Sequence, residues 1–192
     1  MALVAILALS PLLAVIGVAV LVASGSPVLF RQTRVGRGGV PFTMLKFRTM
    51  RSGKSGPGVT AGGDARITAI GRVLRKTKLD ELPELWNVVR GEMSIVGPRP
   101  EVPQFVDMSD TRWQRVLAAR PGITDPTTVG LIDEEKILAA VQGDHEEFYR
   151  RELLPKKLAG YIDYLDRRSW RSDLRVIADT LSAVLSDRSR TA

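Results

Sequence analysis

The chain has 192 residues, a formal net charge of +7, no cysteine and a single histidine, His145. These counts exclude thiolate zinc sites, disulfides and cysteine nucleophiles, and they leave most histidine-based acid/base schemes without their residues. Any chemistry must therefore come from carboxylates, arginine and lysine. The positive charge favours an anionic partner, which includes nucleic acid, anionic lipid and phosphorylated substrates.

The N-terminal segment, residues 1–25, is apolar, and the first charged residue of the chain is Arg31. Its length suits a membrane helix, but Pro11 lacks an N–H donor and Ser10 can bond a preceding carbonyl, which predicts a bend in the middle. We expect a re-entrant helix hairpin that enters and leaves on the cytoplasmic face. A kinked spanning helix and a cleaved signal peptide are the alternatives. Residues 26–192 are expected to form one cytoplasmic domain.

A basic belt follows the apolar segment. Between residues 26 and 63 there are seven basic residues and no acidic one, namely Arg31, Arg34, Arg37, Lys46, Arg48, Arg51 and Lys54. Positive charge directly after an apolar segment marks the cytoplasmic side of a membrane.

Residues 27–50 read as two short extended runs joined by a glycine turn at 36–39, which predicts a β-hairpin with a basic face. Residues 51–63 are rich in Gly and Ser and are expected to form a loop. The Gly-Lys-Ser sequence within that loop is not a P-loop, because Arg48 stands where the leading glycine is required.

Two helices are predicted next. Asp64 can cap a first helix whose apolar face carries Ile67, Ile70, Val73 and Leu74. A second helix spans 80–91, because Gly91 is a natural stop and Pro83 must lie within the first turn. Asp80 and Glu81 are therefore expected at a helix N-terminus.

Two rigid turns that each carry an arginine follow, Arg99 after the apolar run 93–98 and Arg120 before Pro121. From residue 144 onward the chain is predicted to be helical, with an apolar stripe of Leu154, Leu158, Tyr161, Ile162, Leu165, Leu174, Ile177, Leu181 and Val184. Basic residues and Trp170 flank this stripe, so it suits either the membrane interface or the core of the domain.

The adjacent carboxylates Asp80 and Glu81 have a purely structural interpretation, because acidic residues favour helix starts. Their neighbours point to another role, since Arg75, Lys76 and Lys78 precede the pair and Arg99 follows it. A carboxylate can attack phosphorus or hold magnesium, while arginine and lysine neutralise phosphate oxygens. The combination indicates a phosphate site.

Five sequence blocks in a fixed order resemble the bacterial sugar transferase family, the monotopic phosphoglycosyl transferases. The blocks are Ser26 to Gly36, Leu45 to Met50, Leu79 to Val88, Gly91 to Pro100 and Arg120 to Thr124. The break at Ser10 and Pro11 is also similar to the one that turns the family's membrane helix.

The resemblance implies an α+β, mainly helical fold, with a re-entrant membrane helix, a small β-hairpin and amphipathic helices at the membrane interface. It also implies a two-step reaction at the cytoplasmic face of the bacterial inner membrane. A nucleotide-diphosphate sugar, expected to be UDP-linked, gives up a sugar 1-phosphate to a carboxylate of the enzyme, and polyprenyl (undecaprenyl) phosphate then takes it. This would be the first membrane step of glycoconjugate or polysaccharide synthesis.

The family's site residues correspond to particular positions here. Asp80 matches the nucleophile and the ligand of Mg²⁺, and Glu81 matches a supporting position. The phosphate-binding or substrate-binding positions match Lys46, Arg75, Arg99 and, as an acidic site position, Asp173. Asp173 also suits a simple helix cap.

The chain departs from the family's pattern after Thr124. Many relatives continue with a Gly-Trp-Ala-Gln-Val block and an Asn-Gly-Arg turn, whereas this chain continues with 125–130 and an acidic stretch at 133–135. Contacts to the sugar or nucleotide therefore cannot be carried over for this region. The family's basic stretch before the membrane helix also has no counterpart before Ala2.

Two rival interpretations remain open at this point. The basic belt would suit a membrane-tethered nucleic-acid-binding module, whose DNA affinity would fall steeply with salt. An inactive partner of the same fold is the other rival, against which the intact Asp80 and Glu81 pair argues. The transferase interpretation predicts that membrane lipid is a partner and that nucleic acid is not.

Overall fold

The computed structural model describes residues 2–51, 64–127 and 134–189. The helices are α1 (Ala2–Ser24), α2 (Ala69–Lys76), α3 (Glu84–Val89), α4 (Thr111–Leu117), α6 (Glu134–Ala139), α7 (His145–Phe148), α8 (Leu154–Arg167) and α9 (Trp170–Ser189). The strands are β1 (Leu29–Val35), β2 (Pro41–Phe47), β3 (Ser94–Val96) and β4 (Gly122–Thr124). Short turns of other helix types are η1 (Arg37–Gly39), η2 (Leu79–Glu81), η3 (Pro103–Phe105) and η4 (Tyr149–Leu153). The expected mainly helical fold with a small sheet is confirmed.

The expected glycine-rich loop, apart from Arg51, lies outside the described residues, as does Lys54 of the basic belt. Most of the segment in which the chain departs from its relatives, 128–133, also lies outside them.

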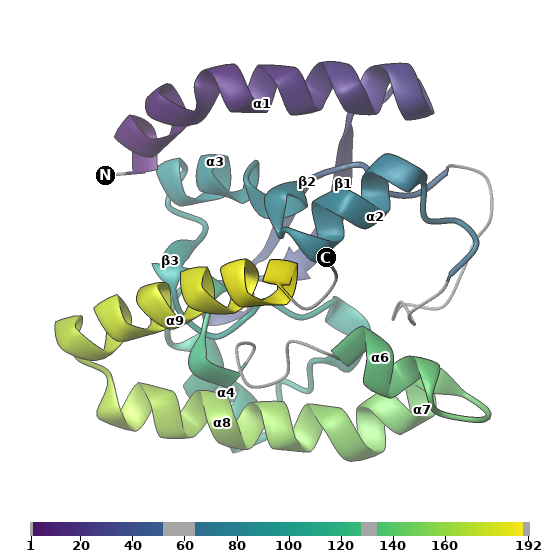
Figure 1. The fold of residues 1–192 in the computed structure, drawn as a ribbon. Coiled ribbons are helices and arrows are strands. Elements are labelled where there is room, and N and C mark those ends of the chain that lie inside the picture. The colour runs from purple at the N-terminus through teal and green to yellow at the C-terminus, as the bar shows by residue number, and fades with distance from the viewer. Residues whose placement is uncertain (1, 52–63, 128–133, 190–192) are drawn as a thin grey trace.

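Helix α1 covers one side of the molecule, above α3 and α2 in Figure 1, while α8 lies along the opposite side. Ile16 and Val20 of α1 are buried and pack with Phe47 and Leu74 of the domain. The half of α1 nearest to β1 therefore rests on the domain.

The remaining surface of α1 is apolar and exposed, as Val15, Val18 and Val22 show. By length and composition the helix is apolar enough to cross a membrane. It continues through Pro11, and the Ser10 hydroxyl donates to the Leu7 carbonyl at 2.8 Å. The structure thus has one helix here, and the re-entrant path remains a prediction.

The predicted β-hairpin is confirmed. Strands β1 and β2 pair antiparallel, from Leu29 opposite Phe47 to Val35 opposite Pro41. The turn between them needs glycine because Gly38 and Gly39 adopt φ of 70° and 78°. Lys46, near the end of β2, is thereby placed at the end of the hairpin away from this turn.

The predicted first helix is shorter than expected and is capped by another residue. Helix α2 begins after Thr68, whose hydroxyl accepts from the Gly71 N–H at 3.0 Å. Asp64 instead forms an ion pair with Arg66 at 2.6 Å. The expectation that Asp64 caps this helix was therefore wrong, because its carboxylate is engaged by Arg66 and lies several residues before the start of α2. Val73, expected in the core, is 55% exposed.

The segment that carries Asp80 and Glu81 is a 3₁₀ turn, η2, and the regular helix α3 starts one turn later at Glu84. Pro83 stands directly before α3, where its missing N–H costs no helical hydrogen bond. Gly91 follows the end of α3 with φ of 76°, so the predicted stop is confirmed.

The two arginine-bearing turns lie side by side because β3 and β4 pair in parallel, Ser94 with Gly122 and Val96 with Thr124. The backbones of these two segments approach so closely that a Cβ at Gly122 would lie 2.1 Å from the Gly97 nitrogen. Only glycine fits there, and this close approach fixes the turn that carries Arg99.

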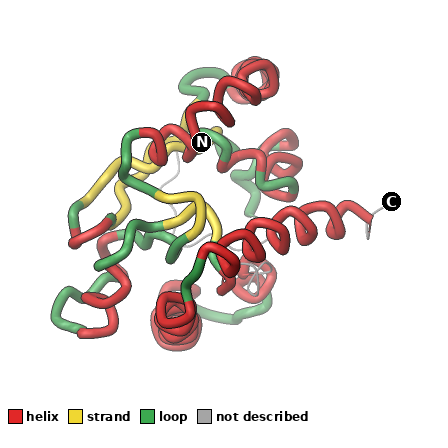
Figure 2. The backbone as a smooth tube through the Cα atoms, turned by 90° about the vertical axis from the view of Figure 1, so that its left-hand side faces the viewer, coloured by secondary structure: helices red, strands yellow, loops and turns green. Residues whose placement is uncertain are grey.

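The apolar stripe predicted for the C-terminal helices divides into two parts. In α8, Leu154, Leu158 and Tyr161 are buried in the largest core cluster, with Trp113 of α4. In α9, large apolar side chains remain exposed, including Trp170, Leu174 and Leu181. Figure 2 shows α9 extending from the body toward the C-terminus. The core interpretation therefore holds for α8, and an interface position for α9 remains a prediction.

Arg48 ties the end of α1 to the hairpin. It is 6% exposed, and its guanidinium donates to the carbonyls of Ser24, Gly25 and Ser26. These carbonyls lie at the C-terminal end of α1, where helical carbonyls lack partners and where a positive charge is stabilising.

Replacing Arg48 by alanine should destabilise the protein by about 3 kcal/mol, because hydrogen bonds to a charged group are lost and buried carbonyls are left unsatisfied. Thermal unfolding in detergent micelles measures this, with Arg31→Ala, an exposed arginine of β1, as the control. Equal melting of R48A and wild type would show that this arginine does not hold α1.

Candidate active site

Glu81 is the centre of a buried ionic cluster. The ammonium of Lys46, from β2, donates to its Oε1 at 2.8 Å. The guanidinium of Arg99 also binds this carboxylate and contacts both of its oxygens. Arg99 also donates to the Ile123 carbonyl of β4 at 3.1 Å. One carboxylate therefore joins three segments that are far apart in the sequence.

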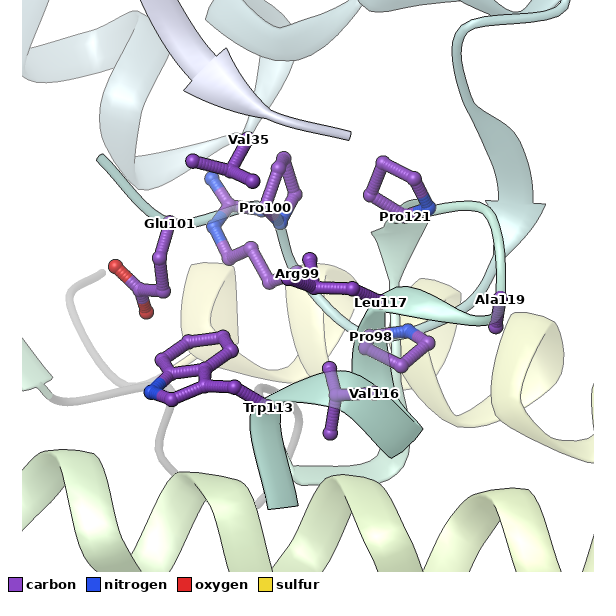
Figure 3. A pocket seen from close by; sticks show the side chains of 10 residues that line it. All are labelled: Val35, Pro98, Arg99, Pro100, Glu101, Trp113, Val116, Leu117, Ala119 and Pro121. Carbon is purple, nitrogen blue, oxygen red and sulfur yellow. The ribbon is translucent and has the colours of Figure 1, made fainter. Parts of the chain in front are cut away.

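The turn that carries Arg99 is held rigidly. Figure 3 shows Pro98, Arg99, Pro100 and Glu101 along this turn, above Trp113 of α4. They line a cavity of about 10 Å³, which is room for about one water molecule.

Glu101, at the end of this turn, is 4% exposed and belongs to a second buried network. It lies 2.8 Å from the Lys157 ammonium and accepts from the Tyr149 hydroxyl at 2.5 Å. Arg34 of β1 donates to the Pro100 carbonyl at 3.0 Å. The turn is thus fixed from α8, η4 and β1, which orients Arg99 toward Glu81.

Asp80 is the neighbour of Glu81 but lies in a different environment. It is 8% exposed, and its Oδ1 is buried with no hydrogen-bond partner among the described residues. Burial raises the pKa of Asp80, and the negative charge of Glu81 raises it further, while Lys46, Lys78 and Arg75 act in the opposite direction. A raised pKa makes the carboxylate more basic, and its Oδ1 is not held by a hydrogen bond to the described residues.

Glu81 shows the opposite behaviour. Burial by itself would raise its pKa, but the charges of Arg99 and Lys46 outweigh burial and hold the pKa of Glu81 well below its usual range. Two adjacent carboxylates therefore have opposite pKa shifts, and Glu81 is held as an anion.

Glu84 is a third carboxylate of the cluster that the sequence did not point to. It is 1% exposed, and its Oε1 lies 3.3 Å from the Lys46 ammonium. Neither of its oxygens has a well-directed hydrogen bond within the described residues. Burial raises the pKa of Glu84 to about 7, against the opposing charge of Lys46. The spacing of three residues from Glu81 is the signal that could have found it, because side chains three apart share a helix face.

Arg75 lies in the last turn of α2, and its charge lowers the pKa of Asp80. Asp173 contacts a different group of side chains at the start of α9. It accepts from the Tyr164 hydroxyl at 2.7 Å and lies 3.3 Å from Arg168. The structure therefore brings Lys46, Asp80, Glu81 and Arg99 together, and the site role of Asp173 remains a prediction.

Asn87 fixes α3 against β2 and was also missed. It is fully buried, its Nδ2 donates to the Thr43 carbonyl at 2.8 Å, and its Oδ1 accepts from the Leu45 N–H at 3.1 Å. The side chain thus continues the hydrogen-bond ladder of β2 on the edge where, in the described part of the chain, no further strand pairs with it. Lys46 is placed beside Glu81 as a result.

The basic belt does not form one exposed stripe. Arg34, Lys46 and Arg48 are turned inward, toward Glu101, Glu81 and the end of α1 respectively. The nucleic-acid-binding interpretation, which rested on the basic belt, is therefore weakened.

The ligand preference of Mg²⁺ can be compared with the oxygen ligands that the site offers. Within the described ranges, no three Asp, Glu, His or Cys side chains are grouped to hold a metal. Mg²⁺ is often bound by one or two carboxylates together with substrate phosphates, however. The unpartnered oxygen of Asp80 fits that mode, since its neighbour Glu81 is engaged by two cations.

A carboxylate with a raised pKa among lysine and arginine side chains is an arrangement suited to phosphoryl transfer. The chain matches the model of the bacterial sugar transferase family over residues 1–187, and it belongs to that family.

Several curated relatives are similar to this chain. A UDP-glucose:undecaprenyl-phosphate glucose-1-phosphate transferase of Caulobacter vibrioides is 40% identical over 92% of this chain and 64% of its own length. An enzyme of the same name from Xanthomonas campestris is 36% identical over 98% of this chain and 38% of its own length. The exopolysaccharide production protein ExoY of Sinorhizobium fredii is 33% identical over 97% of this chain and 83% of its own length. The chain thus spans less than two thirds of the first two relatives.

The raised pKa of Glu84 predicts a pH-dependent stability. Between its ordinary value of 4.5 and about 7, the folded state binds more protons than the unfolded state, so the free energy of unfolding falls as pH rises. Glu84→Gln removes this pH-dependent loss of stability, because glutamine does not ionise. The stability of E84Q relative to wild type should therefore increase from pH 5 to pH 8, by on the order of 3 kcal/mol.

Unfolding at several pH values in one detergent measures this difference, and Glu152→Gln, an exposed glutamate of η4, serves as the control. A difference between E84Q and wild type that stays constant with pH would contradict the prediction.

Proposed function

We propose that the chain transfers a sugar 1-phosphate from a nucleotide-diphosphate sugar to undecaprenyl phosphate, the first membrane step in making a bacterial polysaccharide or glycoconjugate. Membership of the bacterial sugar transferase family supports the general reaction. Two relatives that carry undecaprenyl-phosphate glucose-1-phosphate transferase names support the acceptor and a UDP-linked donor.

The observation that carries the mechanism is the contrast between Asp80 and Glu81. Glu81 is engaged by Lys46 and Arg99, whereas Asp80 keeps an unpartnered oxygen. Glu84 also has unpartnered oxygens, but it is more deeply buried, at 1% exposure against 8% for Asp80. Asp80 is therefore the carboxylate proposed to reach a substrate.

In the first step an oxygen of Asp80 attacks the phosphorus that bears the sugar, and the bond from that phosphorus to the bridging oxygen breaks. A nucleoside monophosphate leaves with the bonding electrons, and the sugar phosphate stays on Asp80 as an acyl phosphate. In the second step an oxygen of undecaprenyl phosphate attacks the same phosphorus. The Asp80 carboxylate is released, and the product is an undecaprenyl-diphosphate sugar. The acceptor is largely dianionic at neutral pH and needs little help from a base.

The positive charges of the cluster serve to bind phosphate. Lys46 and Arg99 hold Glu81 and place positive charge beside Asp80, and Arg75 adds a further charge. Mg²⁺ would be held by Asp80 together with substrate phosphates, and it would offset the repulsion between two anionic partners.

The proposal places α1 in the cytoplasmic leaflet of the inner membrane, with both ends on the cytoplasmic face. One face of the half of α1 after residue 12 packs on the domain through Ile16 and Val20, which supports a position at the membrane surface for this half. The remaining half is too short to cross the roughly 30 Å hydrocarbon core, since each residue of a helix rises 1.5 Å. A bend at Pro11 would return the chain to the surface.

Covalent labelling tests the nucleophile. The detergent-solubilised protein is incubated with magnesium and nucleotide-diphosphate sugars labelled in the sugar-linked phosphate, without acceptor. Wild type should become labelled and Asp80→Asn should not, because an amide is a poor nucleophile. Asp163→Asn, an exposed aspartate of α8, should label normally. Label retained in D80N and lost in E84Q would move the nucleophile to Glu84.

Membrane topology is tested with single cysteines, since the chain has none of its own. Cysteines at Ala2 and Ser26 should both react with an impermeant thiol reagent from the cytoplasmic side of inverted vesicles. Reaction from opposite sides would show that α1 spans the membrane.

A further inference from the structure

Lys78 has an unusual backbone for its residue type. Six residues with clearly positive φ lie in the described part of the chain, and five of them are glycines, namely Gly25, Gly38, Gly39, Gly91 and Gly143. The sixth is Lys78, with φ of 55° and ψ of 16°. A side chain disfavours this left-handed conformation, because Cβ crowds the following carbonyl.

The fold itself would prefer glycine at this position. Lys78 is the second residue after α2, where helices commonly end on a left-handed glycine, and its N–H bonds the Arg75 carbonyl at 3.2 Å. Its own carbonyl accepts from the Glu81 N–H at 3.3 Å, so the residue reverses the chain and turns Asp80 inward. The last turn of α2 already carries Arg75 and Lys76, so the helix end has positive charge without Lys78. A strained residue beside an active site indicates a functional reason for the strain.

The side chain of Lys78 is exposed and, within the described residues, forms no hydrogen bond or ion pair. Lys46 and Arg99 differ in this respect, since both are engaged with Glu81. The charge of Lys78 nevertheless acts on both carboxylates of the pair, where it favours their ionised forms. Lys78 is thus a cation next to Asp80 that is free to take a ligand.

We propose that Lys78 binds the phosphate oxygens of a substrate beside Asp80, and that this contact is the reason for a lysine at a position built for glycine. The inference rests on the proposed function, because it needs a phosphate at Asp80. Two phosphates could supply the ligand, the diphosphate of the donor and the monophosphate of the lipid acceptor, and both present the same anionic oxygens. Lys78 acts in binding, so its loss should raise KM and leave kcat nearly unchanged.

The test uses the full chain in lipid nanodiscs and four variants. Lys78→Gln removes the charge and keeps a side chain, whereas Lys78→Gly removes the charge and relieves the backbone. Lys78→Arg restores the charge, and Arg72→Gln removes an exposed charge from α2 as the matched control. K78G should melt at the same temperature as wild type or higher, which separates binding from folding.

Two kinetic arms distinguish the source of the phosphate. The first follows covalent labelling against the concentration of labelled donor without acceptor. The second follows discharge of the labelled intermediate against the concentration of undecaprenyl phosphate. In one arm or both, K78Q and K78G should raise the half-saturating concentration by about 10- to 100-fold, as expected for a charge-assisted hydrogen bond. K78R and R72Q should remain within about threefold of wild type.

The arm that changes identifies the donor or the acceptor as the ligand. The inference is wrong if K78Q and K78G match wild type in both arms, or if K78Q is impaired and K78G is not, which would show a backbone effect. If the wild-type protein becomes labelled and K78Q and K78G behave like it in both arms, only the inference about Lys78 is overturned. A wild type that never becomes labelled would overturn the proposed function and the role of Lys78 with it.

Discussion

The sharing of Glu81 between Lys46 and Arg99 is the interaction on which the site depends. The three residues come from β2, η2 and the turn after β3, so the ionic cluster forms only when all three segments are in place. Removing one member of a buried ion pair leaves an uncompensated charge and costs several kcal/mol. The cluster therefore makes the position of each segment depend on the other two.

Other buried polar groups hold these segments from outside. Asn87 joins α3 to β2, and Glu101 joins the Arg99 turn to Lys157 of α8. Arg48 follows Lys46 by two residues and binds the carbonyls at the end of α1. Helix α1 and the ionic cluster are thus both anchored at the end of β2, by Arg48 and Lys46 respectively.

Local signals in the sequence predicted much of the fold and less of the site. The hairpin and the end of α3 could be predicted because glycine readily adopts the positive φ that a tight turn and a helix end require, as Gly38 and Gly91 do. The cap of α2 could not, because Asp64 and Thr68 both suit a cap and the sequence does not show that Asp64 pairs with Arg66 while Thr68 caps the helix. Lys46 was assigned to the site only through resemblance to a family, whereas Arg99 was also indicated by its rigid turn after the carboxylate pair. The spacing of Glu84 from Glu81 placed the two on one face, but its burial against Lys46 of a distant strand could not be read from a local pattern.

The 3₁₀ turn explains how neighbouring carboxylates acquire different roles. Successive side chains in such a turn point about 120° apart. Glu81 is directed at Lys46 and Arg99, and Asp80 is directed into a buried region where its Oδ1 has no partner among the described residues. Although burial by itself would raise the pKa of Glu81, the charges of Arg99 and Lys46 hold it as an anion. Burial raises the pKa of Asp80, and the negative charge of Glu81 raises it further, so Asp80 is the more basic of the two carboxylates. Because the two side chains carry the same functional group, this difference is set by their environments.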